Sequence, residues 1–167
     1  MGAVKMKNVF ETTVLSMSGL ELKSVAGRAV DNRSNIFNMS DAAEEAVLRP
    51  KEYGAFEHGM RAALAARIAF LNHEDTLAYK YLEDAGNFKK MANPSYKGET
   101  KDLTSILLFM DKVAKDTRNV KAEDIATLQN VHVSDADIVR LAEINSFMAY
   151  QIRLIAGLRL MKGDQDG

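Results

Sequence analysis

The amino-acid sequence predicts an all-α protein folded as a compact bundle of several helices. Apolar residues recur at helical spacing in several segments, and no alternating strand pattern competes with them. The chain has 167 residues, 47% of them apolar, which suffices for one core without disulfides or a structural metal. We expect one helical domain over residues 28–162, an N-terminal arm or irregular lead-in over 1–27, and a polar tail over 163–167.

Three helices are expected in the first half of this domain. Apolar residues recur every three or four positions from 32 to 48, and Pro50 then breaks the pattern. Residues 56–71 are rich in alanine, and small residues allow neighbouring helices to pack closely, so we expect this helix at the centre of the bundle. A third helix begins after Asn72, which can cap it, and stops before Gly86.

The second half of the domain begins with a loop. Residues 91–98 contain both Pro and Gly, which favour turns. The cleanest amphipathic pattern of the chain follows at 103–115, and a shorter helix is expected at 123–129. Ser134 resembles the start of a capping box, and it predicts a long last helix that continues to about Leu160.

Charge and hydropathy exclude several classes of partner. The formal net charge is −1, from 22 basic and 23 acidic residues that are interspersed along the chain, so we expect no nucleic-acid partner and no anionic membrane. The apolar stretches are interrupted well before the ~18 residues that a membrane span needs. The N-terminal residues contain no sustained apolar run typical of a signal peptide, so we expect a cytoplasmic protein.

The chain contains no cysteine. Disulfides, thiolate nucleophiles, cysteine-ligated zinc and iron–sulfur clusters all need sulfur from the chain itself. The sequence therefore excludes all of these chemistries for this chain.

Two stretches resemble the superfamily of alkylhydroperoxidase AhpD and carboxymuconolactone decarboxylase, particularly its peroxidase-related branch. One is the segment RAALAARIAFLN at residues 61–72, which resembles the helix leading into the redox motif of that family. The other is residues 103–160, where a helix, the phrase VKAED, the link VSDADIV and a long apolar helix follow the order of the family. The resemblance implies an AhpD-like helical bundle and an oligomer.

The same resemblance implies a redox site whose residues are replaced here. Active members carry a Glu on the first helix, a Cys-x-x-Cys motif at the head of the next helix, and a relay His beyond it. The matching positions here are Ala62 for the Glu, Glu74 and Leu77 for the two cysteines, and Tyr81 for the His. A carboxylate or an aliphatic side chain cannot form the disulfide of the catalytic cycle. We therefore expect a cysteine-free, uncharacterised subgroup without thiol-peroxidase activity.

Five residues are candidates for a retained site. Glu74 matches the first cysteine and is the best candidate for proton transfer, although it also suits the start of a helix as a structural charge. His73 precedes it, and Tyr81 lies seven residues beyond it on the same expected helix face. Arg67 and Arg153 lie among apolar residues and need partners. We favour internal or intersubunit ion pairs for them over contact with an anionic ligand.

No metal site or cofactor is expected. His58 and His73, with Glu57 and Glu74 beside them, offer suitable ligand atoms, but adjacent residues point in different directions on a helix. We interpret them as solvated polar residues. His132 stands alone in a short link and is interpreted as structural.

The long last helix favours a homo-oligomer. Its apolar side chains spread over more than one face, so several sides of the helix must be covered. These side chains are Leu141, Ile144, Phe147, Met148, Ile152, Ile155 and Leu158. In a domain of this size we expect a second subunit to supply part of the cover.

Three functions are compatible with these patterns. The hypothesis we favour is a protein that binds a small ligand or takes part in assembly, without redox turnover. The first alternative is a lyase or decarboxylase that acts on a small carboxylated substrate, with Glu74 or His73 as the base and Arg67 or Arg153 holding the carboxylate. The second alternative is an accessory subunit of an active, cysteine-containing relative.

Overall fold

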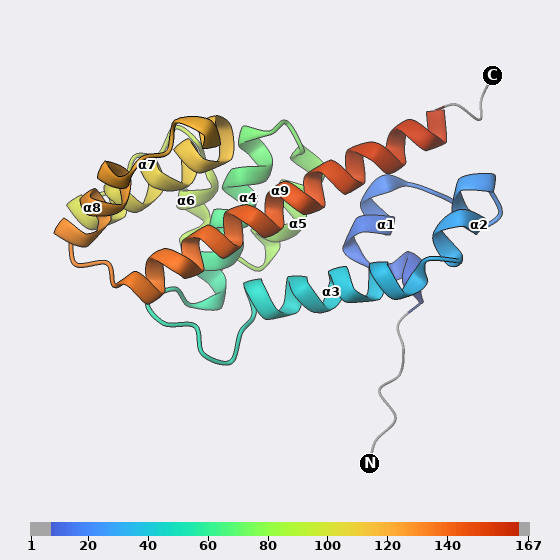
Figure 1. Cartoon of the computed structure of the whole chain (residues 1–167), viewed down its shortest axis with the longest axis horizontal. Helices are drawn as coiled ribbons and strands as arrows, with labels where there is room; N and C mark the ends of the chain where they lie inside the picture. Colours follow the sequence, from blue (N-terminus) through green and yellow to red (C-terminus); the bar gives the residue numbers. More distant parts are fainter. Residues whose placement is uncertain (1–7, 164–167) are drawn as a thin grey trace, which may run out of the picture. The chain divides into compact units, whose positions relative to one another are not determined.

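The computed structural model describes residues 8–163, and this part of the chain is helical with no strand (Figure 1). The predicted all-α class is confirmed. The chain divides into two units: unit 1 comprises Met1–Glu44 and Gln151–Gly167, and unit 2 comprises Glu45–Tyr150. Both boundaries fall inside helices, one in α3 (Ser34–Leu48) and the other in α9 (Asp135–Gly163).

Unit 1 contains helices where the sequence predicts an irregular lead-in. The 3-10 helix η1 (Val9–Glu11) is followed by α1 (Thr13–Ser18) and α2 (Val25–Asp31), so the described part of the lead-in differs from the expectation. Residues 1–7 of the lead-in and 164–167 of the predicted tail lie outside the described residues.

Burial and glycine explain these short helices. Val14 and Leu15 are 3% and 1% exposed, so tertiary contacts stabilise α1 although its sequence shows no clear period. Gly19 ends α1 with a φ of 68°, which glycine adopts without a steric penalty. Gly27 packs against the backbone of Glu21, where a Cβ would meet a carbonyl oxygen at 2.0 Å.

The alanine-rich helix α4 (His58–Leu71) is the buried helix of unit 2, as its composition predicts. Every residue from Arg61 to Ala69 is buried. Helix α4 packs against α5 (Asp75–Glu83), α6 (Lys89–Ala92) and α7 (Lys101–Asp116). The alanines present little bulk, and this allows helices to approach α4 closely.

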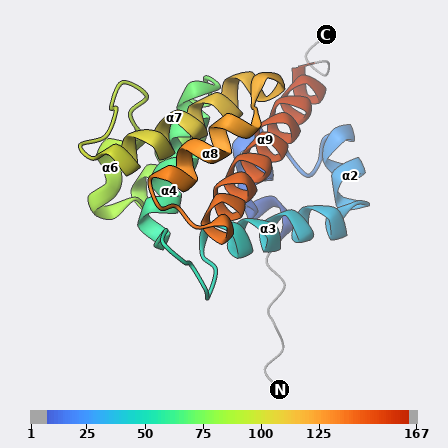
Figure 2. The ribbon, with the colours of Figure 1, turned by 60° about the vertical axis from the view of Figure 1, so that its left-hand side comes forward.

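The predicted helices of unit 2 occur in the predicted order, but α6 was not predicted, and it includes Met91 and Ala92 of the segment expected to be a loop. A single 3-10 turn, η2 (Gly86–Phe88), leads into α6, and another, η3 (Thr117–Asn119), follows α7. Helix α8 (Ala122–Asn130) lies against α7, which is visible in both views (Figure 2). Observed helix ends differ from the predicted ones by up to about three residues, as expected where capping decides the boundary.

The apolar face of α9 is covered within a single chain. Leu141, Ile144, Met148 and Ile155 are each 0% exposed. The breadth of this apolar surface therefore does not by itself require a second subunit. Across residues 8–163, no helix combines the length and the apolar content needed to cross a bilayer.

Candidate ligand-binding site

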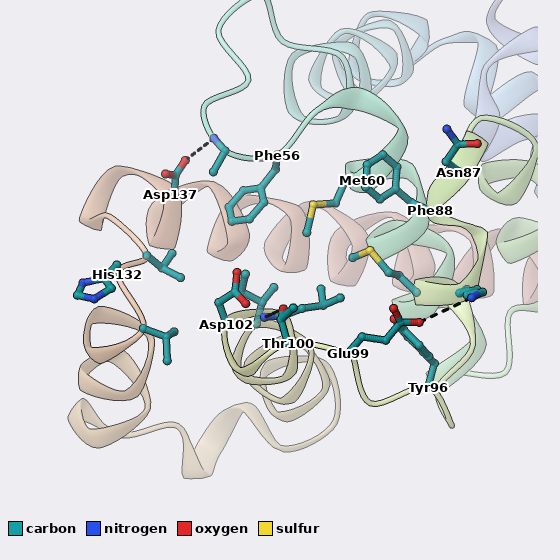
Figure 3. Close-up of a pocket in the computed structure, with 17 residues that line it drawn as sticks. Phe56, Met60, Asn87, Phe88, Tyr96, Glu99, Thr100, Asp102, His132 and Asp137 are labelled. Carbon is teal, nitrogen blue, oxygen red and sulfur yellow. Dashed lines mark hydrogen bonds and ion pairs between the residues drawn. The ribbon is translucent and has the colours of Figure 1, made fainter.

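A pocket of about 570 Å³ lies within unit 2 (Figure 3). Its walls come from the start of α4, the η2–α6 segment, the start of α7, and the link from α8 to α9. This volume falls in the range of small-molecule sites, ~300–1,000 Å³. Four separate segments of the chain thus converge on one cavity.

Apolar side chains form about half of the pocket lining. Phe56, Met91 and Ile106 are 2%, 3% and 6% exposed, and Met60 and Phe88 lie beside them (Figure 3). Methionine side chains are flexible and polarisable, so they adapt to ligands of different shape. Aromatic rings supply a large apolar contact area. This surface suits the apolar body of a small molecule.

Asp102 supplies a carboxylate to the pocket from the first turn of α7. Thr100 caps this helix, because its hydroxyl oxygen accepts a hydrogen bond from the Leu103 N–H at 3.4 Å. A hydrogen bond from the Thr100 hydroxyl holds the pKa of Asp102 below its usual value, and the Leu103 N–H acts in the same direction. Asp102 is therefore ionised at neutral pH.

Tyr96, Glu99 and Lys90 form a second polar group at the pocket. Burial raises the pKa of the Tyr96 hydroxyl, and Glu99 raises it further through its charge and a side-chain hydrogen bond. The Lys90 ammonium lies 3.7 Å from a Glu99 carboxylate oxygen. Tyr96 is therefore a neutral hydrogen-bond donor at neutral pH. The Glu99 carboxylate interacts with both the Tyr96 hydroxyl and the Lys90 ammonium.

Asp137, in the first turn of α9, already has several partners. Its Oδ1 accepts a hydrogen bond from the Ala55 N–H at 3.1 Å and lies 3.0 Å from the Arg140 guanidinium. Its Oδ2 accepts from the Ser134 hydroxyl at 2.7 Å, and the Asp137 N–H donates to the Ser134 hydroxyl oxygen at 3.2 Å, which is the N-cap bond expected at this helix start. Burial acts to raise the pKa of Asp137, but these contacts together hold it below its usual value. Asp137 ties the segment before α4 to the start of α9.

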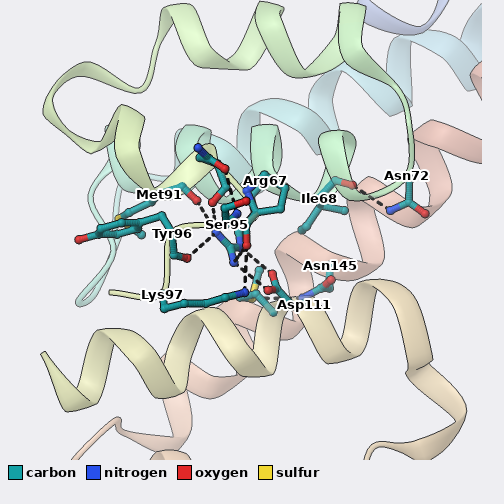
Figure 4. A network of polar contacts seen from close by, with 12 residues as sticks. Arg67, Ile68, Asn72, Met91, Ser95, Tyr96, Lys97, Asp111 and Asn145 are labelled. Atoms are coloured by element: carbon teal, nitrogen blue, oxygen red, sulfur yellow. Dashed lines mark hydrogen bonds and ion pairs between the residues drawn. The ribbon is translucent and has the colours of Figure 1, made fainter. Parts of the chain in front are cut away.

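Arg67 fixes the loop that forms one wall of the pocket (Figure 4). Its guanidinium is fully buried and pairs with both carboxylate oxygens of Asp111, at 2.5 and 2.7 Å. It also donates to backbone carbonyls of the loop, namely those of Met91, Asn93, Pro94 and Tyr96, at 2.6 to 3.2 Å. The predicted internal ion pair of Arg67 is confirmed.

Arg61 holds the segment that leads into α4, which contributes Phe56 to the pocket. Its guanidinium, on the same helix, donates to the carbonyls of Phe56, Val47 and Tyr53 at 2.8, 2.8 and 3.0 Å. Burial lowers the pKa of Arg61, and the nearby Arg140 lowers it further. Two buried arginines of α4 therefore hold two segments of the chain that contribute residues to the pocket. Sequence reasoning noticed one of them, and the other was visible as Arg within the same alanine-rich segment.

Two histidines close helices in the left-handed conformation. His73 follows α4 with a φ of 61°, and His132 follows α8 with a φ of 65°. In each case two backbone bonds complete a Schellman motif. His73 and Glu74 N–H donate to Phe70 and Ala69 carbonyls at 3.1 and 3.0 Å, and the motif recurs at His132. His132 is structural, as predicted, although it also borders the pocket.

None of the five predicted site residues lines this pocket. His73 is exposed, and Glu74 is half-buried at the N-cap of α5, where it makes no side-chain capping bond. Tyr81 is 1% exposed on α5. Arg153 is exposed and belongs to unit 1. Arg67 contributes indirectly, by holding the wall, and the proposed roles of the other four stay predictions.

The pocket residues that the sequence analysis missed carried no motif. Phe56 and Met60 read as ordinary core positions, and Asp102 as a charge at a helix start. In the part of the chain that the structure describes, no group of three or more His, Asp or Glu side chains is placed to hold a metal ion.

Comparison with known proteins gives no family for this chain. No protein-family model matches it, and neither a curated protein nor a solved structure does. The resemblance to the AhpD superfamily therefore stays a prediction, and the function has to be argued from the site.

Proposed function

We propose that this chain is a binding protein that takes up a small molecule with an apolar body in the pocket of unit 2. The observation that carries the proposal is that apolar side chains and polar or charged groups, including Asp102 and Tyr96, line one cavity together. This is the usual composition of small-molecule sites. Two buried arginines fix the pocket walls, so the site is formed before the ligand arrives.

Binding is favoured over acid–base catalysis by the ionisation of the pocket carboxylates. A general acid or base works best with a pKa near the operating pH. The pKa values of Asp102 and Asp137 are lowered, which keeps both groups ionised and poorly basic at neutral pH. The lyase or decarboxylase alternative would need Glu74 or His73 instead, and neither lines this pocket.

The test is a screen of small aromatic and aliphatic fragments by saturation-transfer NMR on two variants. Ala55 is an exposed pocket residue, so Ala55→Trp fills the cavity without disturbing the core. Ala126→Trp places the same side chain at an exposed position of α8 that does not line the pocket. We expect fragments that bind the parent and Ala126→Trp but not Ala55→Trp. If Ala55→Trp binds every fragment like the parent, the proposal is wrong.

We further propose that the chain is a cysteine-free AhpD-like protein without intrinsic thiol-peroxidase activity. The proposal is supported by the resemblance in residues 61–72 and 103–160 and by the absence of cysteine from the sequence. Incubation with an organic hydroperoxide and a dithiol should give no turnover above the uncatalysed rate. Turnover that scales with the concentration of homogeneous protein would contradict this.

A role in assembly is also part of the proposal. Several large apolar side chains of unit 1 are exposed, among them Val25 at 68%, Met39 at 61% and Leu160 at 75%. A second copy that covers such side chains would remove apolar surface from water, and this is the argument for a homo-oligomer. A cytoplasmic location stays a prediction from the sequence.

A further inference from the structure

We propose that the ligand of this pocket is an organic cation, specifically a protonated amine attached to an aromatic or aliphatic body. The inference rests on the proposed function and names the class of molecule that the pocket accepts. It is argued from the charges around the cavity and from the side chains of its inner surface.

The balance of charge at the pocket favours a cation. Three carboxylates line it, those of Glu99, Asp102 and Asp137, against the lysine Lys90. Glu99 lies near Lys90, and Asp137 is bound by Arg140, so these two carboxylates already have cationic partners. An anionic ligand would be repelled by the third carboxylate.

Asp102 is the pocket carboxylate that we assign to the ammonium group of the ligand. Within the described residues, the contacts that lower its pKa come from neutral groups, the Thr100 hydroxyl and the Leu103 N–H. Its side chain points into the pocket towards Phe56 (Figure 3). An ammonium group placed beside Asp102 would gain a charge-assisted hydrogen bond.

The inner surface suits the remainder of such a ligand. Aromatic rings attract cations to their faces, and Phe56 and Phe88 both line the cavity. Thioether sulfurs, here those of Met60 and Met91, pack well against aromatic and aliphatic groups. The pocket therefore offers an ionised carboxylate and an adaptable apolar surface within one cavity of about 570 Å³.

The experiment compares three probes with the same phenyl group. They are 2-phenylethylamine, which is a cation, 2-phenylethanol, which is neutral, and 3-phenylpropionate, which is an anion. Affinity is measured by calorimetric or NMR titration at low salt. An ion pair that is partly open to water contributes up to about 1 kcal/mol, so we expect the amine to bind about fivefold more tightly than the alcohol, and the propionate to bind most weakly.

Three variants assign the preference to Asp102. In Asp102→Asn the amine should bind no better than the alcohol, whereas Asp102→Glu, which keeps the charge, should restore the preference. Asp116→Asn removes an exposed carboxylate at the other end of α7 and should leave the preference unchanged. Circular dichroism of each variant shows whether the helices are retained, and Asp102→Ser, which also removes the charge, replaces Asp102→Asn if that variant unfolds.

Either of two affinity results would overturn the inference. One is equal affinity of the parent protein for the amine and the alcohol, and the other is an amine preference that survives in Asp102→Asn. If none of the three probes binds but other fragments are lost in Ala55→Trp, the inference fails while the proposed function stands. If no fragment distinguishes Ala55→Trp from Ala126→Trp, the proposed function fails as well.

Discussion

Arg67 illustrates what a single residue does in this protein. A fully buried guanidinium is stable only when every donor has a partner, and here the partners are Asp111 and the carbonyls of the 91–96 loop. The sequence predicts that such a residue is paired. It does not predict the partner, because the residues concerned lie 24 to 44 positions away along the chain.

Replacement of Arg67 by Lys should lower the free energy of unfolding by about 2 to 4 kcal/mol. Lysine keeps the charge but has three donors on a flexible stem, so the paired geometry with Asp111 and most carbonyl bonds are lost. Urea unfolding followed by circular dichroism measures the change. Arg153→Lys, at an exposed position, should change the stability by less than about 0.5 kcal/mol. Equal stability of both variants would contradict the role assigned to Arg67.

His73 and His132 allow a second prediction at the scale of the residue. Their positive φ suits glycine best and β-branched residues worst. His73→Gly should raise the free energy of unfolding by about 0.5 kcal/mol, and His73→Val should lower it by about 1 to 2 kcal/mol. The same order is expected at His132.

His58 provides the control for these substitutions, because it begins α4 and has no positive φ. Glycine should give no gain in stability there. Equal stability of His73→Gly and His73→Val would contradict the role of His73 in ending α4 with a left-handed conformation. A functional role for His73 would then have to be reconsidered.

At the scale of the helix, periodicity predicted most elements and capping refined their ends. Helices α3, α4, α7 and α9 follow from the spacing of their apolar residues and the caps beside them. Helices α1, α2 and α6 were missed, because their short apolar runs show no period and depend on burial for stability. The spacing of apolar residues identifies a helix only when the helix is long enough for that spacing to recur.

The junction of α7 and α8 should be sensitive to acid. The Lys112 ammonium donates to both oxygens of Asp124, at 2.8 and 2.6 Å, and the Lys121 N–H donates to one of them at 2.7 Å. The bond from Lys112 lowers the pKa of Asp124, with a further contribution from Lys121. A lowered pKa in the folded state stabilises the fold above the unfolded value of about 4, and this stabilisation is lost as the pH falls through the folded value.

Asp124→Asn should therefore be less stable than the parent at pH 7 and lose less stability on acidification. Urea unfolding at several values between about pH 3 and pH 7 measures both effects. Asp31→Asn, an exposed carboxylate in unit 1, should follow the parent. Parallel curves for the parent and Asp124→Asn would show that this carboxylate does not link folding to pH.

At the scale of the whole molecule, the position of the pocket could not be predicted from the sequence. It joins side chains from segments that are spread between residues 55 and 137. The sequence analysis placed the candidate site at Glu74 and Tyr81 on the strength of a family resemblance. Long-range packing, which no local pattern encodes, determines where a cavity forms.

The oligomeric state is the second property of the whole molecule that awaits measurement. Leu141, Ile144, Met148 and Ile155 of the last helix are buried within one chain, so the remaining argument is the exposed apolar residues of unit 1, such as Val25 and, near the end of that helix, Leu160. Light scattering at high micromolar concentration should report at least a dimer. Val25→Lys and Leu160→Lys should shift the mass towards the monomer. A strictly monomeric parent would contradict the prediction.

The central claim is that the pocket of unit 2 binds a small molecule, and methyl NMR with ¹³C-labelled methionines tests it most directly. Met60 and Met91 line the pocket. Met110 and Met148 are fully buried and do not line it, and Met39 is exposed in unit 1. Titration with a fragment that binds should shift the Met60 and Met91 methyl signals in a saturable manner and leave that of Met39 unchanged. Binding that shifts Met39 but neither pocket methionine would contradict the account.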